Sequence, residues 1–235
     1  METIAERLKS VQTTIKQSTL EAHRAPNSVK LLAVSKTKPV SDIVQAYEVG
    51  QRLFGENYVQ EGIEKIQELQ KLDDIEWHFI GPLQSNKTRV VATHFDWVQS
   101  VDRLKIAQRL NDQCPADKEL YICIQVNIDD DPNKAGIKSA ELNDFVDAIA
   151  KMPNLLLRGL MTIPKGQQTP EQQQNSFRKM ADLFNALKTT SPNIDTLSMG
   201  MSGDMEQAVN NDSTMIRVGT AIFGKRNQTK ESNAT

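Results

Sequence analysis

A lysine directly beyond an apolar run is the side chain of this sequence best placed for covalent chemistry. Lys36 follows the run Leu31–Ser35 (LLAVS), so its amine would lie beside a dry core. Desolvation disfavours the ammonium and lowers the pKa of a lysine, which favours the neutral amine that forms a Schiff base with a carbonyl. A solvated lysine that ends a strand explains the position equally well, and Lys38 lies two residues further on. We therefore hold Schiff-base chemistry at Lys36 as a hypothesis beside a structural role.

Two segments rich in small residues could hold a phosphate group. The segment Ser198–Ser202 (SMGMS) precedes a helix that is predicted to open near Asp204, and backbone N–H groups at such a point bind anions. Gly219 and Thr220, near the end of the last apolar run, could supply the other half of the site. A flexible turn explains either segment alone. Together they suit the phosphate site that barrel enzymes form after their seventh and eighth strands.

Three further polar residues lie in or next to apolar runs. Arg217 lies in the last run, where a buried guanidinium needs an acceptor, and a salt bridge to a carboxylate such as Glu56 is the structural alternative. Asn57 could act at a site or cap the helix that follows it. His78, beside Trp77 in a predicted strand, is interpreted as a core histidine with satisfied hydrogen bonds rather than as a catalytic group.

Metal chemistry and disulfide bonding find little support in the sequence. The candidate side chains are scattered, without the HExxH or CxxC spacing of metal sites: His23, His78, His94, Cys114 and Cys123. Two cysteines in a chain of 235 residues indicate buried or free thiols. We predict no metal site.

The apolar periodicity predicts the elements that position these residues. The predicted strands cover residues 31–34, 52–54, 77–80, 97–100, 121–128, a part of 155–163, 194–197 and 215–221. The predicted helices cover residues 1–17, 41–50, 58–72, 85–93, 102–113, 139–151, 171–189 and 204–211, with Ser41 as the N-cap of the second. This strict alternation predicts an α/β fold, a single (β/α)8 TIM barrel with an extra N-terminal helix. An open, doubly wound sheet is the alternative.

Such a barrel would bring the candidate residues together, because its site forms at the carboxyl ends of the strands. The predicted domain spans residues 1–235, with a polar tail from residue 225 that we expect to be frayed.

The composition excludes several functional classes. Lys and Arg number 28 and Asp and Glu number 30, so the net charge of -2 lacks the basic excess expected of a nucleic-acid or membrane-surface protein. Hydrophobic residues make up 38% of the chain, and no run is long enough to span a membrane. The first 17 residues predict an amphipathic helix rather than a signal peptide, so we expect a cytoplasmic protein.

Seven segments carry a specific pattern in combination: LLAVSKTKP at 31–39, FGENYVQE at 54–61, WHFIGPLQSNK at 77–87, VNIDDDPNKAGI at 126–137, RGLMTIP at 158–164, LSMGMSGDMEQAV at 197–209 and IRVGTAIFG at 216–224. With these segments, the sequence resembles the YggS/PROSC-type family of pyridoxal phosphate homeostasis proteins along essentially its whole length. The resemblance implies a barrel similar to the N-terminal domain of alanine racemases that carries pyridoxal 5'-phosphate (PLP) on a lysine.

The resemblance also implies which residues bind the cofactor: Lys36, Asn57, Ser198, Ser202, Arg217, Gly219 and Thr220. It makes Lys36 the Schiff-base lysine and places Arg217 opposite the pyridine nitrogen of PLP. The serines of LSMGMS, with Gly219 and Thr220, would hold the phosphate, and Asn57 would lie against the ring. Lys134, in NKAGI, resembles a family lysine that receives the cofactor or influences its exchange.

The residue opposite the ring nitrogen bears on whether the protein is an enzyme. An arginine such as Arg217 cannot accept a proton, so it keeps the ring neutral and weakens the ring as an electron sink. Racemases add a second base from a β-rich domain, and we expect too few residues after the last strand for one. We therefore predict a monomeric carrier that buffers PLP, delivers it to PLP-dependent apo-enzymes and regulates vitamin B6 and amino-acid homeostasis, with no catalytic residues. A PLP-dependent racemase-like enzyme and a cofactor-free Schiff-base aldolase are the alternatives.

Overall fold

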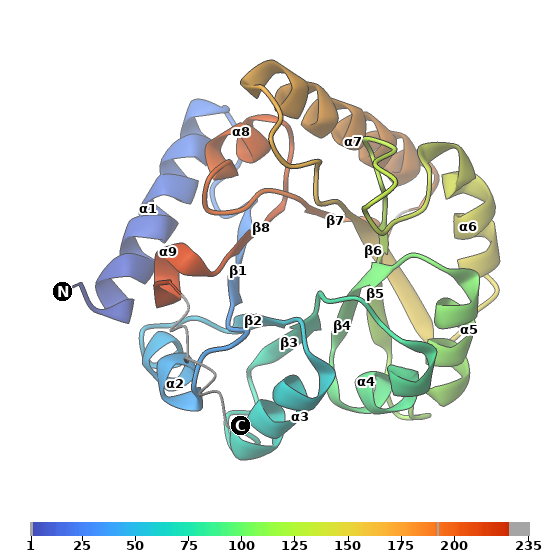
Figure 1. Ribbon diagram of the computed structural model, residues 1–235, viewed down its shortest axis with the longest axis horizontal. Coiled ribbons are helices and arrows are strands. Elements are labelled where there is room, and N and C mark those ends of the chain that lie inside the picture. Colours follow the sequence, from blue (N-terminus) through green and yellow to red (C-terminus); the bar gives the residue numbers. More distant parts are fainter. Residues whose placement is uncertain (1, 192, 226–235) are drawn as a thin grey trace, which may run out of the picture.

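The chain closes into a barrel of eight parallel strands. The computed structural model describes residues 2–191 and 193–225, and the strands follow one another around the barrel in sequence order. Strand β8 pairs with β1 and closes the ring, with the helices on its outside (Figure 1). The predicted (β/α)8 barrel is therefore confirmed, and the open, doubly wound sheet is excluded. Of the polar tail predicted from residue 225, residues 226–235 lie outside the described residues.

The elements alternate as the sequence predicts, with small shifts at their ends. The strands are β1 Lys30–Val34, β2 Leu53–Glu56, β3 Glu76–Phe79, β4 Trp97–Val101, β5 Leu120–Gln125, β6 Leu155–Met161, β7 Thr196–Ser198 and β8 Met215–Val218. The helices are α1 Ile4–Glu21, α2 Val40–Glu48, α3 Val59–Glu68, α4 Thr88–His94, α5 Leu104–Gln113, α6 Leu142–Ile149, α7 Pro170–Thr190, α8 Met205–Asn210 and α9 Thr220–Phe223. Short 3-10 turns at Ser85–Lys87 and Ser139–Glu141 precede α4 and α6. Within the described ranges, no helix is long and apolar enough to cross a membrane.

The extra N-terminal helix α1 is fixed by its cap and by its apolar face. Thr3 and Glu6 form a reciprocal capping box that satisfies two free N–H groups of the first turn. Ile4, Leu8 and Ile15 lie on one buried face of the helix, at the spacing of helical turns. That face packs against α8 and α9, so α1 covers the seam where the last strand meets the first (Figure 1).

Two predicted boundaries are wrong for identifiable reasons. Pro39, not Ser41, is the N-cap of α2, because its fixed backbone angle and missing N–H suit the position before the first helical residue. Strand β8 ends at Val218 rather than at residue 221, and Gly219 becomes the N-cap of the short helix α9. The sequence pattern does not reveal α9 because its four residues are as apolar as the strand before them.

The inside of the barrel is more polar than the aliphatic filling typical of such folds. Gln99 on β4 is hydrogen-bonded to Ser198 on β7, and these strands are not neighbours in the sheet, so the bond crosses the interior. His78 and Arg217 are also buried, and each is hydrogen-bonded to one member of this pair. The main apolar core lies instead between the strands and the helices. The lumen thus contains a connected set of buried polar side chains, which is more typical of a functional site than of a purely structural core.

Candidate functional site

The candidate residues meet at the carboxyl ends of β1, β2, β7 and β8. In the sheet, Val34 is paired with Gly55 and Ala33 with Val218, so the residues that follow β1 lie between those that follow β2 and β8. Lys36 is half-buried in the turn after β1, and Asn57 directly follows β2. The structure therefore brings Lys36, Asn57 and the end of β8 to one mouth of the barrel, as the topology predicts.

The neighbouring lysine, Lys38, has a structural role. Its Nζ atom donates hydrogen bonds to the carbonyl oxygens of Phe223, at 2.9 Å, and Lys225, at 3.0 Å. These carbonyls belong to the end of α9 and the residues after it, where a cation is favoured by the helix dipole. Lys38 thus attaches α9 to the loop after β1.

Arg217 lies in the barrel lumen beneath the mouth, with 5% of its surface exposed. Its Nη1 donates to the hydroxyl of Ser198 at 2.7 Å, and its Nη2 donates to the carbonyl of Thr162 at 2.8 Å. Burial lowers the pKa of Arg217 to about 10, while the charge of Asp204 opposes this shift, so the guanidinium remains a cation at neutral pH. The alternative salt bridge to Glu56 is excluded, because Glu56 is bound by Lys65.

A chain of hydrogen bonds runs from Arg217 through the lumen to the other end of the barrel. The Ser198 hydroxyl donates to Gln99 Oε1 at 2.6 Å, and Gln99 Nε2 lies 2.9 Å from His78 Nδ1. His78 Nε2 lies 2.9 Å from the carboxylate of Glu76. We assign the imidazole proton to Nε2, because only then does Nδ1 accept from the Gln99 amide. Every member of the chain then donates toward Glu76.

His78 is the buried, satisfied core histidine that the sequence indicates. It stacks on Trp97 with ring centroids 5.1 Å apart. Burial lowers the pKa of His78, and the nearby carboxylate of Glu76 only partly opposes this, which agrees with a neutral ring. Gln99 and Glu76 were not among the predicted residues. The sequence offers one indication of them: Glu76 is two residues from His78, and Gln99 is two residues from Trp97. Residues two apart in a strand point to the same side of the sheet.

The segments after β7 and β8 are joined to each other at the mouth. The backbone N–H of Arg217 donates to the carbonyl of Gly200 at 3.0 Å, which places the loop before α8 beside the end of β8. Gly200 has a φ of 95°, and a Cβ atom there would lie 2.5 Å from Cβ of Ala208, so only glycine fits. Helix α8 starts just after Asp204 and α9 just after Gly219. Two helix starts thus lie at the predicted phosphate position.

The two predicted serines differ in their surroundings. The hydroxyl of Ser198 is buried, accepts from Arg217 and donates to Gln99, so it fixes the arginine. Ser202 is half-buried in the loop before α8, at the mouth of the barrel. Gly219 is half-buried and Thr220 is exposed at the start of α9. Phosphate binding by these residues stays a prediction.

Asn57 has an unsatisfied buried atom. The N-cap of α3 is Tyr58, so Asn57 does not cap that helix as one interpretation of the sequence suggested. Among the described residues, its Oδ1 has no hydrogen-bond partner and is shielded from solvent. A buried amide oxygen without a donor is costly, and a bound ligand is one way to satisfy it. Asn57 is therefore a good candidate for contact with a cofactor.

Lys134 lies on the loop after β5, also at this end of the barrel. Its Nζ donates to the carbonyl of Pro164 at 3.1 Å, which ties the loop after β5 to the loop after β6. Asp129 reinforces the contact by accepting from the backbone N–H of Lys165 at 2.7 Å. A role of Lys134 in cofactor exchange stays a prediction.

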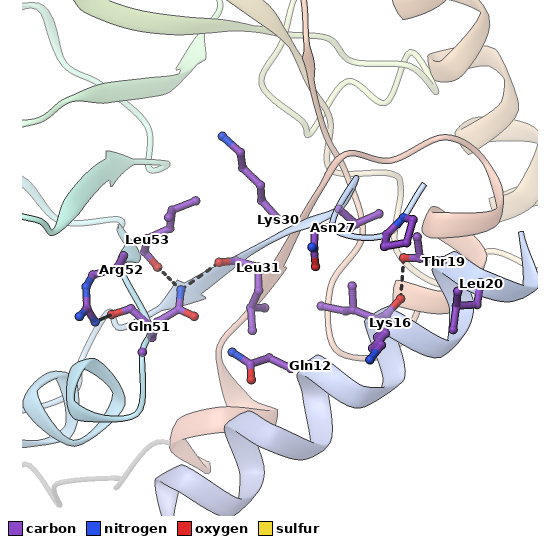
Figure 2. Close-up of a pocket in the computed structure, with 14 residues that line it drawn as sticks. Gln12, Lys16, Thr19, Leu20, Asn27, Lys30, Leu31, Gln51, Arg52 and Leu53 are labelled. Atoms are coloured by element: carbon purple, nitrogen blue, oxygen red, sulfur yellow. Dashed lines mark hydrogen bonds between the residues drawn. The ribbon is translucent and has the colours of Figure 1, made fainter. Parts of the chain in front are cut away.

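A separate hollow lies at the opposite, amino-terminal end of the strands, between α1 and the starts of β1 and β2 (Figure 2). The amide of Gln51 points to the carbonyl oxygens of Leu31 and Leu53 and is satisfied by them. Arg52 is bound to Asp74 and stacks on Tyr47. These polar groups are occupied by contacts that hold the strand ends, as expected at the stability face of a barrel. Within the described residues, no cluster of three or more metal-ligating side chains occurs.

The fold and the site define a (β/α)8 barrel with a lysine at its mouth, a buried arginine beneath it and two helix starts beside it. This class is that of the family described as "Alanine racemase, N-terminal domain", which matches residues 13–227. An alanine racemase from Corynebacterium glutamicum shares the fold, with a TM-score of 0.72 and 15% identity; the match covers 94% of this chain and 61% of the racemase.

Within that class, the chain belongs to the pyridoxal phosphate homeostasis protein family. Its relatives of that name from Haemophilus influenzae and Escherichia coli K12 are each 53% identical over 98% of this chain, and the match covers 99% and 100% of the relatives. Two structures of PipY from Synechococcus elongatus also match 94% of this chain and 100% of PipY. The structure without PLP has a TM-score of 0.84 and 41% identity, and the structure with PLP bound has 0.81 and 38%. The family that the sequence motifs resemble is therefore confirmed.

Proposed function

We propose that this protein binds PLP at the barrel mouth, as a Schiff base on Lys36, and that it buffers and carries the cofactor. The observation that supports this most is the meeting of Lys36, the buried Arg217 and the starts of α8 and α9 at one end of the barrel. The related PipY has been solved with PLP bound, and relatives matched over their whole length are named for PLP homeostasis.

The residues present fit the cofactor. The buried, unsatisfied Oδ1 of Asn57 needs a hydrogen-bond donor at the place where the ring would lie. Gly200 keeps the loop before α8 close to β8, so the N–H groups near Ser202 and Gly219 would face a shared phosphate. PLP supplies an aldehyde for Lys36 and a pyridine ring for Arg217.

The covalent step is a condensation at Lys36. The unprotonated form of its Nζ would add to the aldehyde carbon of PLP, and the loss of one water molecule would leave a carbon–nitrogen double bond. No electrons are exchanged with another reactant, so the step reverses when water adds back. This reversibility is what a carrier needs in order to deliver its load.

Arg217 favours a carrier over an enzyme. Its guanidinium stays protonated and is fixed by Ser198 and Thr162, so it would donate to the ring nitrogen and could not accept a proton from it. An unprotonated ring withdraws electrons weakly and does little to stabilise a carbanion. We therefore propose that the protein acts as a monomer without turnover of its own and supplies PLP to apo-enzymes, which links it to vitamin B6 and amino-acid pools.

Two measurements test this function. Loaded protein mixed with an apo-enzyme and a scavenger of free PLP should restore that enzyme's activity, whereas a Lys36→Ala variant should not. The purified, loaded protein should also leave Cα hydrogens of a broad amino-acid panel unexchanged in heavy water, at the level of free PLP. Exchange well above that level that is lost in Lys36→Ala would contradict the carrier and favour the racemase-like alternative.

A further inference from the structure

A buried lysine on α3, outside the lumen, binds the two chain segments that carry Lys36 and Asn57. Lys65 has 4% of its surface exposed. Its Nζ donates to the carbonyl of Ser35 at 2.8 Å, to Glu56 Oε1 at 2.8 Å and to Glu61 Oε1 at 2.6 Å. An ammonium has three N–H donors, and each has its own acceptor here. The carbonyl belongs to the residue just before Lys36.

Two further hydrogen bonds complete this group, which we call the Lys65 cluster: Lys65, Glu56 and Glu61, with Ser35 and Thr37 as their targets. The Ser35 hydroxyl donates to Glu56 Oε1 at 2.6 Å. The backbone N–H of Thr37 donates to Glu61 Oε1 at 2.6 Å. The residues on both sides of Lys36 are thus held by side chains from β2 and α3.

The cluster lies on the helix-facing side of the sheet. Ala33 and Phe54 belong to the core between strands and helices. A Cβ atom on Gly55 would lie 3.2 Å from the side chain of Leu32, so these two neighbours of Phe54 and Ala33 share the other side of the sheet. Side chains alternate along a strand, so Ser35 and Glu56 share the side of Ala33 and Phe54. Each of them directly precedes a candidate site residue, Lys36 or Asn57. Fixing the first residue of each pair toward the helices turns the second toward the mouth.

The backbone next to Lys36 needs such support. Thr37 has a φ of 61°, a left-handed conformation that is costly for a β-branched residue. The bond from its N–H to Glu61 holds the turn in that conformation. Without it, the turn after β1 would relax toward ordinary angles and Lys36 would move with it.

The charges of the cluster argue for positioning rather than for stability alone. Glu56 is fully buried, and burial raises the pKa of its carboxyl while the Lys65 ammonium opposes this shift. Its second oxygen, Oε2, has no partner among the described residues. Apolar residues in such a place are often as stabilising as a buried ion pair. The buried ion pair therefore needs a reason other than stability, and holding the backbone of Ser35 and Thr37 in a fixed position is such a reason.

We propose that Lys65, Glu56 and Glu61 are positioning residues that hold Lys36 and Asn57 in the orientation that binds PLP. This inference rests on the proposed function, because the benefit of the orientation is the Schiff base at Lys36. It predicts that disturbing the cluster weakens the covalent bond to PLP selectively. Binding of the ring and phosphate by Arg217 and the starts of α8 and α9 should be spared, because the cluster contacts neither.

The test compares two ligands on three variants. PLP reports on Lys36, and 4'-deoxypyridoxine 5'-phosphate, which has the ring and phosphate but no aldehyde, reports on the remaining site. Glu61→Ala removes the acceptor of the Thr37 N–H, and Lys65→Met/Glu56→Gln removes both buried charges at nearly constant volume. Glu64→Ala is the control, because Glu64 is an exposed glutamate on the same helix that is bound by Gln60.

We expect Glu61→Ala and the double variant to lose PLP about 10- to 100-fold faster than the control, as measured by decay of the visible band with a scavenger present. The affinity of Glu61→Ala for the aldehyde-free analogue should stay within about 2-fold of the control, because Glu61 holds the turn of Lys36 and not Asn57, and that binding also shows that the variant is folded. PLP loss by Glu61→Ala equal to that of Glu64→Ala, or an equal loss of both ligands by Glu61→Ala, would overturn the positioning role. Unmodified protein that forms no Schiff base at Lys36 would instead refute the proposed function itself.

Discussion

Gln99 is the central member of the hydrogen-bond chain in the lumen, and its removal has a calculable cost. It accepts from the Ser198 hydroxyl and donates to His78 Nδ1, and all three side chains are buried. Gln99→Leu would leave the Ser198 O–H without an acceptor and His78 Nδ1 without a donor, although Ser198 would still accept from Arg217 and His78 would still bind Glu76. Each such loss costs about 1–3 kcal/mol, so we expect the free energy of unfolding to fall by about 2–6 kcal/mol. For a chain of this size, that lowers Tm by on the order of 10 °C.

A double-mutant cycle in urea tests the reasoning behind this number. If the Ser198 hydroxyl is one of the stranded groups, then Ser198→Ala removes part of the penalty, and the double variant Gln99→Leu/Ser198→Ala should be more stable than the sum of the single changes predicts. We expect an interaction energy of about 1 kcal/mol or more. A destabilisation by Gln99→Leu below about 1 kcal/mol, or strict additivity of the two changes, would show that these hydrogen bonds between Ser198, Gln99 and His78 do not form in solution.

Two other predictions follow from burial at the site. Burial lowers the pKa of His78 from its ordinary value of 6.5, so in mildly acidic solution the unfolded chain binds a proton that the folded chain does not. The free energy of unfolding should therefore fall as the pH drops from about 7 to 5, by up to about 1.4 kcal/mol per pH unit. In urea titrations, His78→Gln should flatten the dependence of the unfolding free energy on pH, and a change at the exposed His23, His23→Asn, should not. An unchanged pH dependence in His78→Gln would contradict the assignment of His78 as a buried, neutral ring. A Cβ at Gly200 would clash with Ala208 and Ile216, so Gly200→Ala should weaken binding of the aldehyde-free analogue and destabilise the fold by about 1–3 kcal/mol. Gly203→Ala, where a Cβ meets nothing within 4 Å, should change neither, and equal effects of the two would refute this.

The elements of the barrel are largely predictable from the sequence, because each strand is an apolar run between polar helical stretches. Lys36, Asn57 and the segments after β7 and β8 are predictable as mouth residues for the same reason: they follow strands, and the ends of parallel strands meet. Helix α9 is not predictable from periodicity, because its residues continue the apolar pattern of β8.

The contacts that fix the site residues are harder to predict. Whether a polar residue in a strand points into the lumen or toward a helix depends on register, and the ladder shifts between β4 and β5 and again between β5 and β6. The sequence therefore does not reveal that Gln99 meets Ser198 across the barrel. Lys65 is missed for a related reason. A lysine on a helix is expected in solvent, and only the carboxylates and the Ser35 carbonyl, brought together by the fold, make its burial favourable.

We propose above all that Lys36 is the residue that carries the cofactor. Borohydride reduction of the PLP-loaded protein, followed by peptide mapping with mass spectrometry, tests this claim most directly. We expect one reduced pyridoxyl group per chain, on the peptide that contains Lys36, and none in the Lys36→Ala variant. A label on Lys38, which holds α9, or on Lys134, or no label on a protein that has gained a visible band, would contradict the claim.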